Sequence, residues 1–418
     1  MKIVHAADLH LDSPMRGLEY YAGAPVERLR GATRVAMQRL VDLCLEEKAS
    51  LLLLAGDLFD GPWRDYSTGL FFLSELGRLR DAGTRVVSVR GNHDAASQVT
   101  RHLRLPEHVT ELGAKRPESR LFESLGVAVH GQSFPRRDTT DDLASRYPPA
   151  VEGMLNVGLL HTALTGRAGH EPYAPCRLET LVDKGYDYWA LGHVHQHEVV
   201  CDSPWVVFPG NLQGRHVKEA GPKGVVLLSV DDACVTRVEH QALDVVRWAH
   251  CMVEGTSGDT PDDVLQRIVG LLSEQLREAG DRLLAARITV AGVCGAHAAL
   301  QREPEHWEGE IRALANDLAA EQLWIEQVRF ETLPVVDVAL LAARDDAIGQ
   351  VVRNLRALKS NPQQLVQLKA EFAGLASKLP AELCQGDDPV RLDDPEYFRG
   401  VLDDVERMLL PRLGRLVD

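Results

Sequence analysis

The stretch LLLLAGDLFD, residues 51–60, changes from an apolar run to a polar cluster within ten residues. A short apolar run that ends at a glycine is typical of a buried strand, and the polar residues after it would stand at the carboxyl end of that strand. Gly56 lets the chain turn sharply where a Cβ would crowd a group bound close to the backbone. The stretch therefore predicts a buried strand that delivers Asp57 and Asp60 to one edge of a sheet.

The same pattern of an apolar strand followed by polar residues occurs four more times. The further clusters are Asp8-Leu9-His10, Gly91-Asn92-His93-Asp94, His161 and Gly192-His193-Val194-His195. Helical apolar spacing separates the early strands, at about 26–48 and 66–81. Alternating strands and helices favour a partly parallel sheet, and the carboxyl edge of such a sheet gathers residues that are distant in sequence.

The residue types in these clusters indicate which ions they would bind. Carboxylate and amide oxygens mixed with imidazole nitrogens, without thiolates, favour Mn²⁺, Fe²⁺ or Zn²⁺ over Ca²⁺ or a cysteine zinc site. In Asp8-Leu9-His10 and His193-Val194-His195, side chains two residues apart share one face if the backbone is extended, so both can reach one metal or adjacent metals. The histidines interpreted as structural are His5, His130, His170, His197 and His216.

In order and completeness, the five clusters resemble the signature of the calcineurin-like metallophosphoesterases, D-x-H, G-D-x-x-D, G-N-H-D, H and G-H-x-H. The resemblance implies a four-layer α/β/β/α sandwich of mixed sheets that holds two divalent metal ions. It implies one metal on Asp8, His10, Asp57 and His195, and the other on Asp57, Asn92, His161 and His193. It also implies that His93 is a catalytic residue outside the ligand set, with Asp94 as the carboxylate that orients its ring.

The residues around the motifs narrow this resemblance. HAADLHLDSP at 5–14, YDYWALGHVHQHEV at 186–199 and FPGNLQGRHVKEAGPKG at 208–224 resemble bacterial DNA repair exonucleases of the SbcD and YhaO type, nearest to YhaO. That similarity implies a Mn²⁺-dependent nuclease that cuts DNA beside an SMC-like coiled-coil ATPase of the SbcC type, and a homodimer is a family expectation. Asp60 departs from the pattern, because archaeal and eukaryotic relatives often carry His there. We interpret Asp60 as a residue that positions His93, a water or the substrate.

The pattern of strands and helices divides the chain into three parts. Residues 1–245 carry all five clusters and form the expected metallophosphoesterase domain, and residues 246–334 form a small α+β unit that resembles the capping domain of the nuclease family. Residues 335–418 lose the strand signals and form a helical tail. Apolar faces of the tail suit either a partner coiled coil or internal packing, and they carry Leu365, Leu368, Phe372, Leu375, Val401, Leu402, Val405 and Leu409.

Net charge bears on how the chain could hold DNA. A formal charge of −15 counts against a protein that grips DNA by its own bulk electrostatics. It leaves room for a nuclease whose metal ions face the phosphate or whose partner supplies much of the grip. Arg215 is the first choice for a substrate contact. The basic loop residues that are either phosphate contacts or solvated surface are Arg101, Arg104, Arg136, Arg137, Arg167, Arg215, Lys218 and Lys223.

The remaining features of the sequence indicate a cytoplasmic protein without membrane association, because neither a signal peptide nor an apolar run of bilayer length is found. The seven cysteines are scattered and are expected to be reduced core residues. Two other functions stay open. A phosphatase or cyclic-nucleotide phosphodiesterase would use the same site, and a non-catalytic scaffold is disfavoured because the ligand set is complete.

Overall fold

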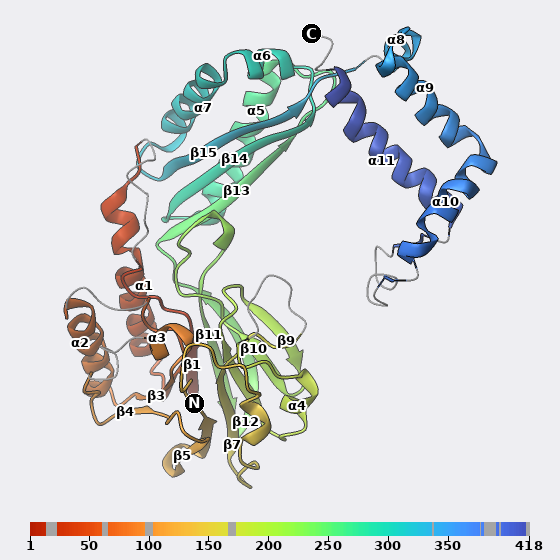
Figure 1. Ribbon diagram of the computed structural model, residues 1–418. Helices are drawn as coiled ribbons and strands as arrows, with labels where there is room; N and C mark the ends of the chain where they lie inside the picture. The colour runs from red at the N-terminus through yellow and green to blue at the C-terminus, as the bar shows by residue number, and fades with distance from the viewer. Residues whose placement is uncertain are drawn as a thin grey trace. The chain divides into compact units, whose positions relative to one another are not determined.

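The computed structural model describes residues 1–13, 23–60, 66–96, 103–165, 173–336, 338–376, 378–379, 390–392 and 394–414. These residues form two compact units (Figure 1). The first comprises Met1–His250, Leu272–Arg287 and Ala315–Gln327, and the second comprises Cys251–Leu271, Ile288–Leu314 and Val328–Asp418. The three-part division at 245 and 334 stays a prediction.

The first sheet has the strand order β12-β11-β1-β2-β3-β4. Strands β1 (Lys2–Ala6), β2 (Leu51–Ala55), β3 (Arg85–Val89) and β4 (Val109–Glu111) run parallel, whereas β11 (Gly224–Asp231) and β12 (Cys234–Ala242) form an antiparallel edge. Helices α1 (Val26–Glu46) and α2 (Ser67–Asp81) connect the first three strands. The short helix α3 (Asn92–Ala96) begins directly after β3.

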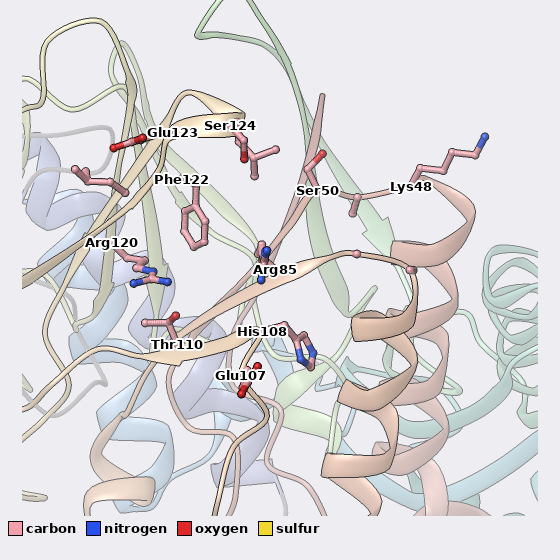
Figure 2. A pocket seen from close by; sticks show the side chains of 15 residues that line it. Lys48, Ser50, Arg85, Glu107, His108, Thr110, Arg120, Phe122, Glu123 and Ser124 are labelled. Carbon is pink, nitrogen blue, oxygen red and sulfur yellow. The ribbon is translucent and has the colours of Figure 1, made fainter.

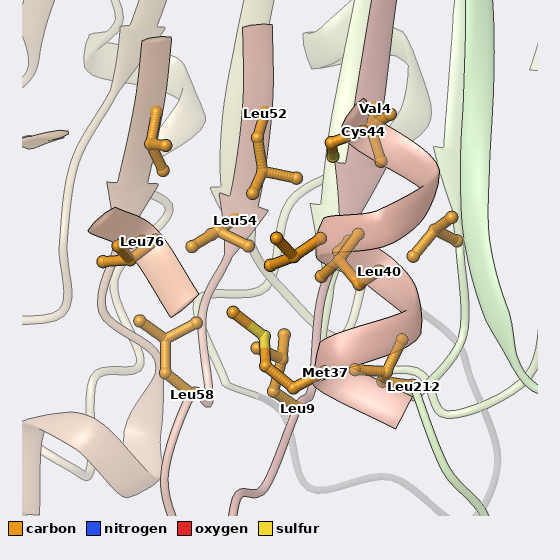
Figure 3. Close-up of a cluster of buried hydrophobic side chains, with 14 of the residues drawn as sticks. Val4, Leu9, Met37, Leu40, Cys44, Leu52, Leu54, Leu58, Leu76 and Leu212 are labelled. Atoms are coloured by element: carbon orange, nitrogen blue, oxygen red, sulfur yellow. The ribbon is translucent and has the colours of Figure 1, made fainter. Parts of the chain in front are cut away.

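Strand β2 is buried on both faces, which explains its uninterrupted apolar run. Leu52 and Leu54 pack against Leu40 of α1 and Leu76 of α2 (Figure 3). Leu51 and Leu53 face the other way, toward the second sheet. The expected parallel strand is confirmed, and its carboxyl end is held between two hydrophobic cores.

The second sheet has the strand order β5-β6-β7-β8-β10-β9. Its strands are β5 (Glu118–Phe122), β6 (Val127–Gly131), β7 (Leu155–His161), β8 (Tyr188–Gly192), β10 (Trp205–Phe208) and β9 (Glu198–Asp202). Its central strands are parallel and its two edge strands, β5 and β9, are antiparallel to their neighbours. The expected sandwich of two mixed sheets is confirmed, and the outer face of this second sheet packs on loops, the 3₁₀ turn η4 (Ala144–Arg146) and the short helix α4 (Leu178–Val182).

A third sheet has the order β13-β14-β15, formed by Val246–Glu254, Leu283–Val293 and Leu323–Leu333. Helices α5 (Pro261–Ala279), α6 (His297–Arg302) and α7 (Pro304–Ala319) lie between these strands in the chain. The amides of Leu284 and Cys294 donate to the carbonyls of Gln322 and Leu333, so β14 and β15 run in the same direction. The strands are therefore parallel with helical crossovers, which corrects the expected α+β unit to an α/β one.

The C-terminal region is helical, as expected, with α8 (Val338–Ala343), α9 (Ala347–Ser360), α10 (Pro362–Ala376) and α11 (Pro395–Gly414). Leu365 and Leu402 are buried together with Phe398, so internal packing explains these two residues. Phe372 and Leu375 of α10 remain 37% and 51% exposed, and the ring of Phe372 lies 5.4 Å from that of Phe398, so internal packing accounts for Phe372 in part and leaves Leu375 unexplained.

Two further sequence expectations concern cysteines and membranes. Of the six described cysteines, all free, Cys234 is exposed and Cys201 is half-buried, so the expectation of core residues is wrong for these two. Cys384 lies outside the described residues. Within the part of the chain that the structure describes, no helix combines the length and apolar character needed to cross a membrane.

Candidate metal centre

The loops that follow β1 and β2 run side by side. The amides of Asp8, His10 and Leu11 donate to the carbonyls of Gly56, Asp57 and Leu58 at 3.0, 3.1 and 3.0 Å. Asp8, His10 and Asp57 have φ angles of 50°, 42° and 52°, which is the left-handed region that non-glycine residues seldom adopt. Asp8 and His10 do converge, but the expectation of an extended backbone between them is wrong. Strained backbone of this kind concentrates at functional sites.

The first cluster of ligand atoms comes from Asp8, His10 and His195. His10 Nε2 lies 3.2 Å from His195 Nε2, and His195 Nε2 lies 3.7 Å from Asp8 Oδ1. Asp8 Oδ1 is buried and accepts no hydrogen bond from the described residues. Burial, with the nearby Arg215 and histidines, holds the pKa of His10 well below its ordinary value. A neutral imidazole is the form that binds a metal, so His10 can act as a ligand, and the buried Asp8 oxygen, which lacks a donor in the described part of the chain, suits a cation.

The second cluster lies beside the first. His161 Nε2 is 3.1 Å from Asn92 Oδ1 and 3.5 Å from Asp57 Oδ2. His161 Nδ1 donates to the Ala55 carbonyl at 2.9 Å, which leaves the Nε2 lone pair facing these oxygens. The ring of His193 lies 5.3 Å from that of His161. The structure thus brings all four residues expected at the second metal to one place.

Asp8 also belongs to the second cluster, together with Asp57 and His161. Two buried carboxylates at this position oppose each other's ionisation, and burial together with the charge of Asp8 raises the pKa of Asp57. Divalent cations would neutralise both groups, so the donor set fits a dimetal site. The assignment of Asp57 as the bridging ligand stays a prediction.

Glycines permit this close approach. A Cβ at position 91 would meet Asp57 Oδ1 at 2.2 Å, and one at position 192 would meet the Ala55 carbonyl oxygen at 1.9 Å. Both contacts are closer than real Cβ atoms tolerate. The glycines of G-N-H-D and G-H-x-H are therefore required by packing around the ligands.

His93 contacts Asp60 and not Asp94. His93 Nδ1 lies 2.9 Å from Asp60 Oδ1, and this hydrogen bond raises the pKa of His93. Asp60 also accepts from the Ser13 hydroxyl at 2.8 Å and lies 3.6 Å from Arg215 Nη1. Although burial opposes it, the hydrogen bonds from His93 and Ser13 lower the pKa of Asp60 to about 2.

Asp94 has a different role from the one expected. Its buried carboxylate accepts hydrogen bonds from the amides of Leu58, Phe59 and Gly91 at 3.1 to 3.2 Å. Burial and the neighbouring Asp57 raise its pKa to about 7. The expectation that Asp94 orients His93 is wrong, because this carboxylate instead holds the loop that carries Asp57 and Asp60.

Glu219 is a site residue that was not recognised in the sequence. Its Oε1 accepts from His195 Nδ1 at 2.8 Å, and its Oε2 accepts from Asn211 Nδ2 at 2.9 Å. Against the effect of burial, the neighbouring carboxylates of Asp8 and Glu219 raise the pKa of His195 to about 9. Arg215 binds both oxygens of Glu219, so Arg215 is part of the wall of the site and its side chain is only 15% exposed.

A cleft of about 570 Å³ opens above the ligands. Its floor includes Asp57, Asn92, His93, His193 and His195. The exposed Arg137, His216 and Lys218 line it as well, so the structural interpretation of His216 is corrected to a cleft residue. Tyr173 also lines the cleft, and its ring lies 5.5 Å from that of His193.

The other basic residues named from the sequence, where the structure describes them, are not exposed cations of the cleft. Lys223 is 2% exposed and its Nζ donates to the His195 carbonyl at 2.6 Å, so it braces the G-H-x-H loop. Arg104 and Arg136 are exposed but do not line the cleft, and Arg101, Arg167 and His170 lie outside the described residues. His5, His130 and His197 are hydrogen-bonded within the fold, as expected for structural histidines.

Comparison with known proteins agrees with this geometry. Residues 1–197 match the calcineurin-like phosphoesterases, and residues 248–333 match the middle domain of the metallophosphoesterase YhaO. The chain therefore belongs to the calcineurin-like metallophosphoesterases. Within that class it is a member of the YhaO family. It is 34% identical to the uncharacterized metallophosphoesterase YhaO of Bacillus subtilis over 284 residues, which covers 67% of this chain and 69% of the relative.

The chain is also similar, more distantly, to a DNA repair protein and to a phosphatase of known structure. The DNA double-strand break repair protein Mre11 of Methanopyrus kandleri is 27% identical over 296 residues, and the match covers 64% of this chain. The chain spans 62% of the length of that relative. A dimetal phosphatase from Danio rerio is 10% identical and the match covers 55% of this chain and 92% of that one, with a TM-score of 0.34.

Proposed function

We propose that this protein is a two-metal-dependent nuclease that hydrolyses phosphodiester bonds in DNA during repair, as an exonuclease and also at internal bonds. The observation that carries the proposal is the His93–Asp60 pair beside two clusters of metal-ligand atoms, in a cleft lined by exposed cations. Similarity to a DNA repair protein supports DNA as the substrate.

Seven residues would hold the two metals: Asp8, His10, Asp57, Asn92, His161, His193 and His195. The mixture of oxygen and imidazole donors fits Mn²⁺, Fe²⁺ or Zn²⁺, and Mn²⁺ is proposed because of the resemblance to Mn²⁺-dependent nucleases. When bound, two such ions supply Lewis acidity toward the scissile phosphate.

His93 would act on the leaving group. Because Asp60 occupies Nδ1, Nε2 is the ring atom available to a substrate in the cleft. A proton held at Nε2 can pass to the leaving oxygen as the bond to phosphorus breaks. Asp60 fixes the ring for this step, so it acts through His93 rather than on the substrate.

Arg137 and Lys218 would bind phosphates of the DNA backbone, since both are exposed and line the cleft. Two cations give little affinity in a chain of charge −15. An SMC-like coiled-coil ATPase of the SbcC type would supply the remaining grip. The exposed Phe372 and Leu375 of α10 are suited to receiving its coiled coil.

The test is cleavage of end-labelled linear and covalently closed DNA with Mn²⁺, using the wild-type chain, Asp57→Asn and the distant control Asp42→Asn. We expect the wild type and the control to cut, and Asp57→Asn to lose at least about 100-fold in rate. Cleavage of small phosphoesters or cyclic nucleotides without cleavage of DNA would replace this proposal with the phosphatase or phosphodiesterase alternative. Equal DNA cleavage by wild type and Asp57→Asn would indicate a contaminating nuclease and refute the assignment.

A further inference from the structure

A second pocket lies at the opposite edge of the first sheet from the metal ligands. It has a volume of about 570 Å³. Its walls are the segment before β2, the start of β3, the segment leading into β4, and β5 with the turn after it (Figure 2). The amino ends of β2 and β3 therefore form this pocket, whereas their carboxyl ends carry Asp57 and Asn92. None of the residues that line the metal cleft lines this pocket.

Two arginines in the pocket are available to a ligand. Arg85 and Arg120 are exposed, and neither forms an ion pair or a side-chain hydrogen bond with any described residue. Figure 2 shows both side chains at this pocket. Elsewhere in this acidic chain, arginines such as Arg34 and Arg287 pair with carboxylates. Two guanidinium groups that share a pocket repel each other unless an anion lies between them, and a phosphate binds to both.

An aromatic ring lies beside these cations. Phe122 is half-buried at the end of β5, and Figure 2 shows its ring between the side chains of Arg85 and Arg120. The Arg120 guanidinium carbon lies 5.8 Å from the centre of that ring. The hydroxyls of Ser50, Thr110 and Ser124 line the same pocket and make no side-chain hydrogen bond with the described residues. A ring for stacking, cations for phosphate and hydroxyls for a sugar or base together match a nucleotide.

We propose that this pocket binds a free mononucleotide, with its phosphate on Arg85 and Arg120 and its base against Phe122. Two acidic residues favour a single nucleotide over a nucleic acid strand. Glu107 and Glu123 line the pocket, are exposed, and form no ion pair among the described residues, so they would repel the further phosphates of a strand. The site does not depend on whether the metal cleft cuts DNA.

The test is calorimetric titration of the full chain with dAMP in the presence of EDTA, so that the metal cleft does not contribute through bound ions. The same titration in Asp57→Asn should give the same affinity, because that residue lies at the other edge of the sheet. We expect Arg85→Ala and Arg120→Ala each to weaken binding by at least about tenfold, and Phe122→Leu to weaken it by a similar factor. Arg177→Ala removes another exposed arginine outside both pockets and should leave the affinity unchanged.

Three results would overturn the proposal. One is a dAMP affinity that does not change in Arg85→Ala and Arg120→Ala. Another is inorganic phosphate binding as tightly as dAMP, since the contact of the base with Phe122 would then contribute nothing. The third is a single-stranded oligonucleotide that binds more tightly than dAMP and loses affinity in the same variants, because the surface would then be a nucleic acid contact. Circular dichroism of each variant separates lost binding from lost folding.

Discussion

His93 Nδ1 lies 2.9 Å from Asp60 Oδ1, and the same carboxylate accepts from Ser13 and lies 3.6 Å from Arg215. The three partners of Asp60 come from separate segments of the chain, namely α3 and the loops that carry Ser13 and Arg215. The arrangement orients the ring beside the expected ligand His10, whose Nδ1 lies 3.9 Å from Asp60 Oδ1. It gives a structural role to the aspartate at the end of G-D-x-x-D.

Replacing Asp60 should impair catalysis and spare metal binding. We expect Asp60→Asn to lower kcat for DNA cleavage by about 10- to 100-fold, because the ring of His93 loses the acceptor that orients it. Manganese content measured by mass spectrometry should match that of the wild type. The matched control is Asp42→Asn, which removes an aspartate of α1 that is paired with Arg78 of α2. A large loss of bound manganese in Asp60→Asn would show that Asp60 is a ligand itself.

His93 and Asp57 should separate chemistry from metal binding. His93→Ala should lower kcat by about 100- to 10,000-fold and keep both metals, since its imidazole is hydrogen-bonded to Asp60 and is not one of the seven expected ligands. Asp57→Ala should lose metal as well as activity, because Asp57 is buried among the ligand atoms. Metal analysis of both purified variants decides the matter, and equal metal content in the two would contradict the assigned roles.

Glu219 should control metal affinity through His195. The carboxylate accepts from His195 Nδ1, so it fixes the tautomer that directs Nε2 toward Asp8. We expect Glu219→Gln to weaken Mn²⁺ binding by about 10- to 100-fold in a calorimetric titration. Glu219→Asp should restore part of the affinity, whereas Glu239→Gln on β12 should have no effect.

A purely structural role would give a different result for Glu219. The melting temperature of the metal-free protein would then fall in Glu219→Gln, while the Mn²⁺ affinity of the folded fraction would remain that of the wild type. Measuring both quantities on the same preparation separates the two roles.

The ligand-bearing strand ends could be predicted because their signal is local. Asp57 directly follows the apolar run of β2 and Gly56. The polar residues after β1 and β8 also stand close to the end of an apolar strand. The partners of these side chains could not be predicted in the same way. Glu219 meets His195 across 24 residues, and Asp60 meets His93 rather than the adjacent Asp94, because loop positions in space decide both contacts. Asp and His adopt the left-handed region more often than most residues, but the sequence does not indicate that both Asp8 and His10 do so here.

The last prediction concerns acid stability and rests on His5, which lies in β1 at 0% exposure. Its Nε2 donates to the Leu191 carbonyl at 3.1 Å and its Nδ1 accepts from the Tyr188 hydroxyl at 2.9 Å, so the folded state holds the ring neutral. Burial lowers the pKa of His5 from 6.5 to about 3. Between these pH values the unfolded chain binds a proton that the folded chain does not, so stability falls as pH decreases through this window.

His5→Gln should remove this contribution, because glutamine does not titrate and can still donate to the Leu191 carbonyl. Between pH 7 and pH 5 the free energy of unfolding of the wild type should decrease by about 2 kcal/mol more than that of the variant. Urea unfolding in EDTA at both pH values measures the difference, since the other titrating groups are common to both proteins. His306→Gln, which replaces an exposed histidine of α7, should follow the wild type. Parallel curves for wild type and His5→Gln would mean that His5 accepts a proton in the folded state.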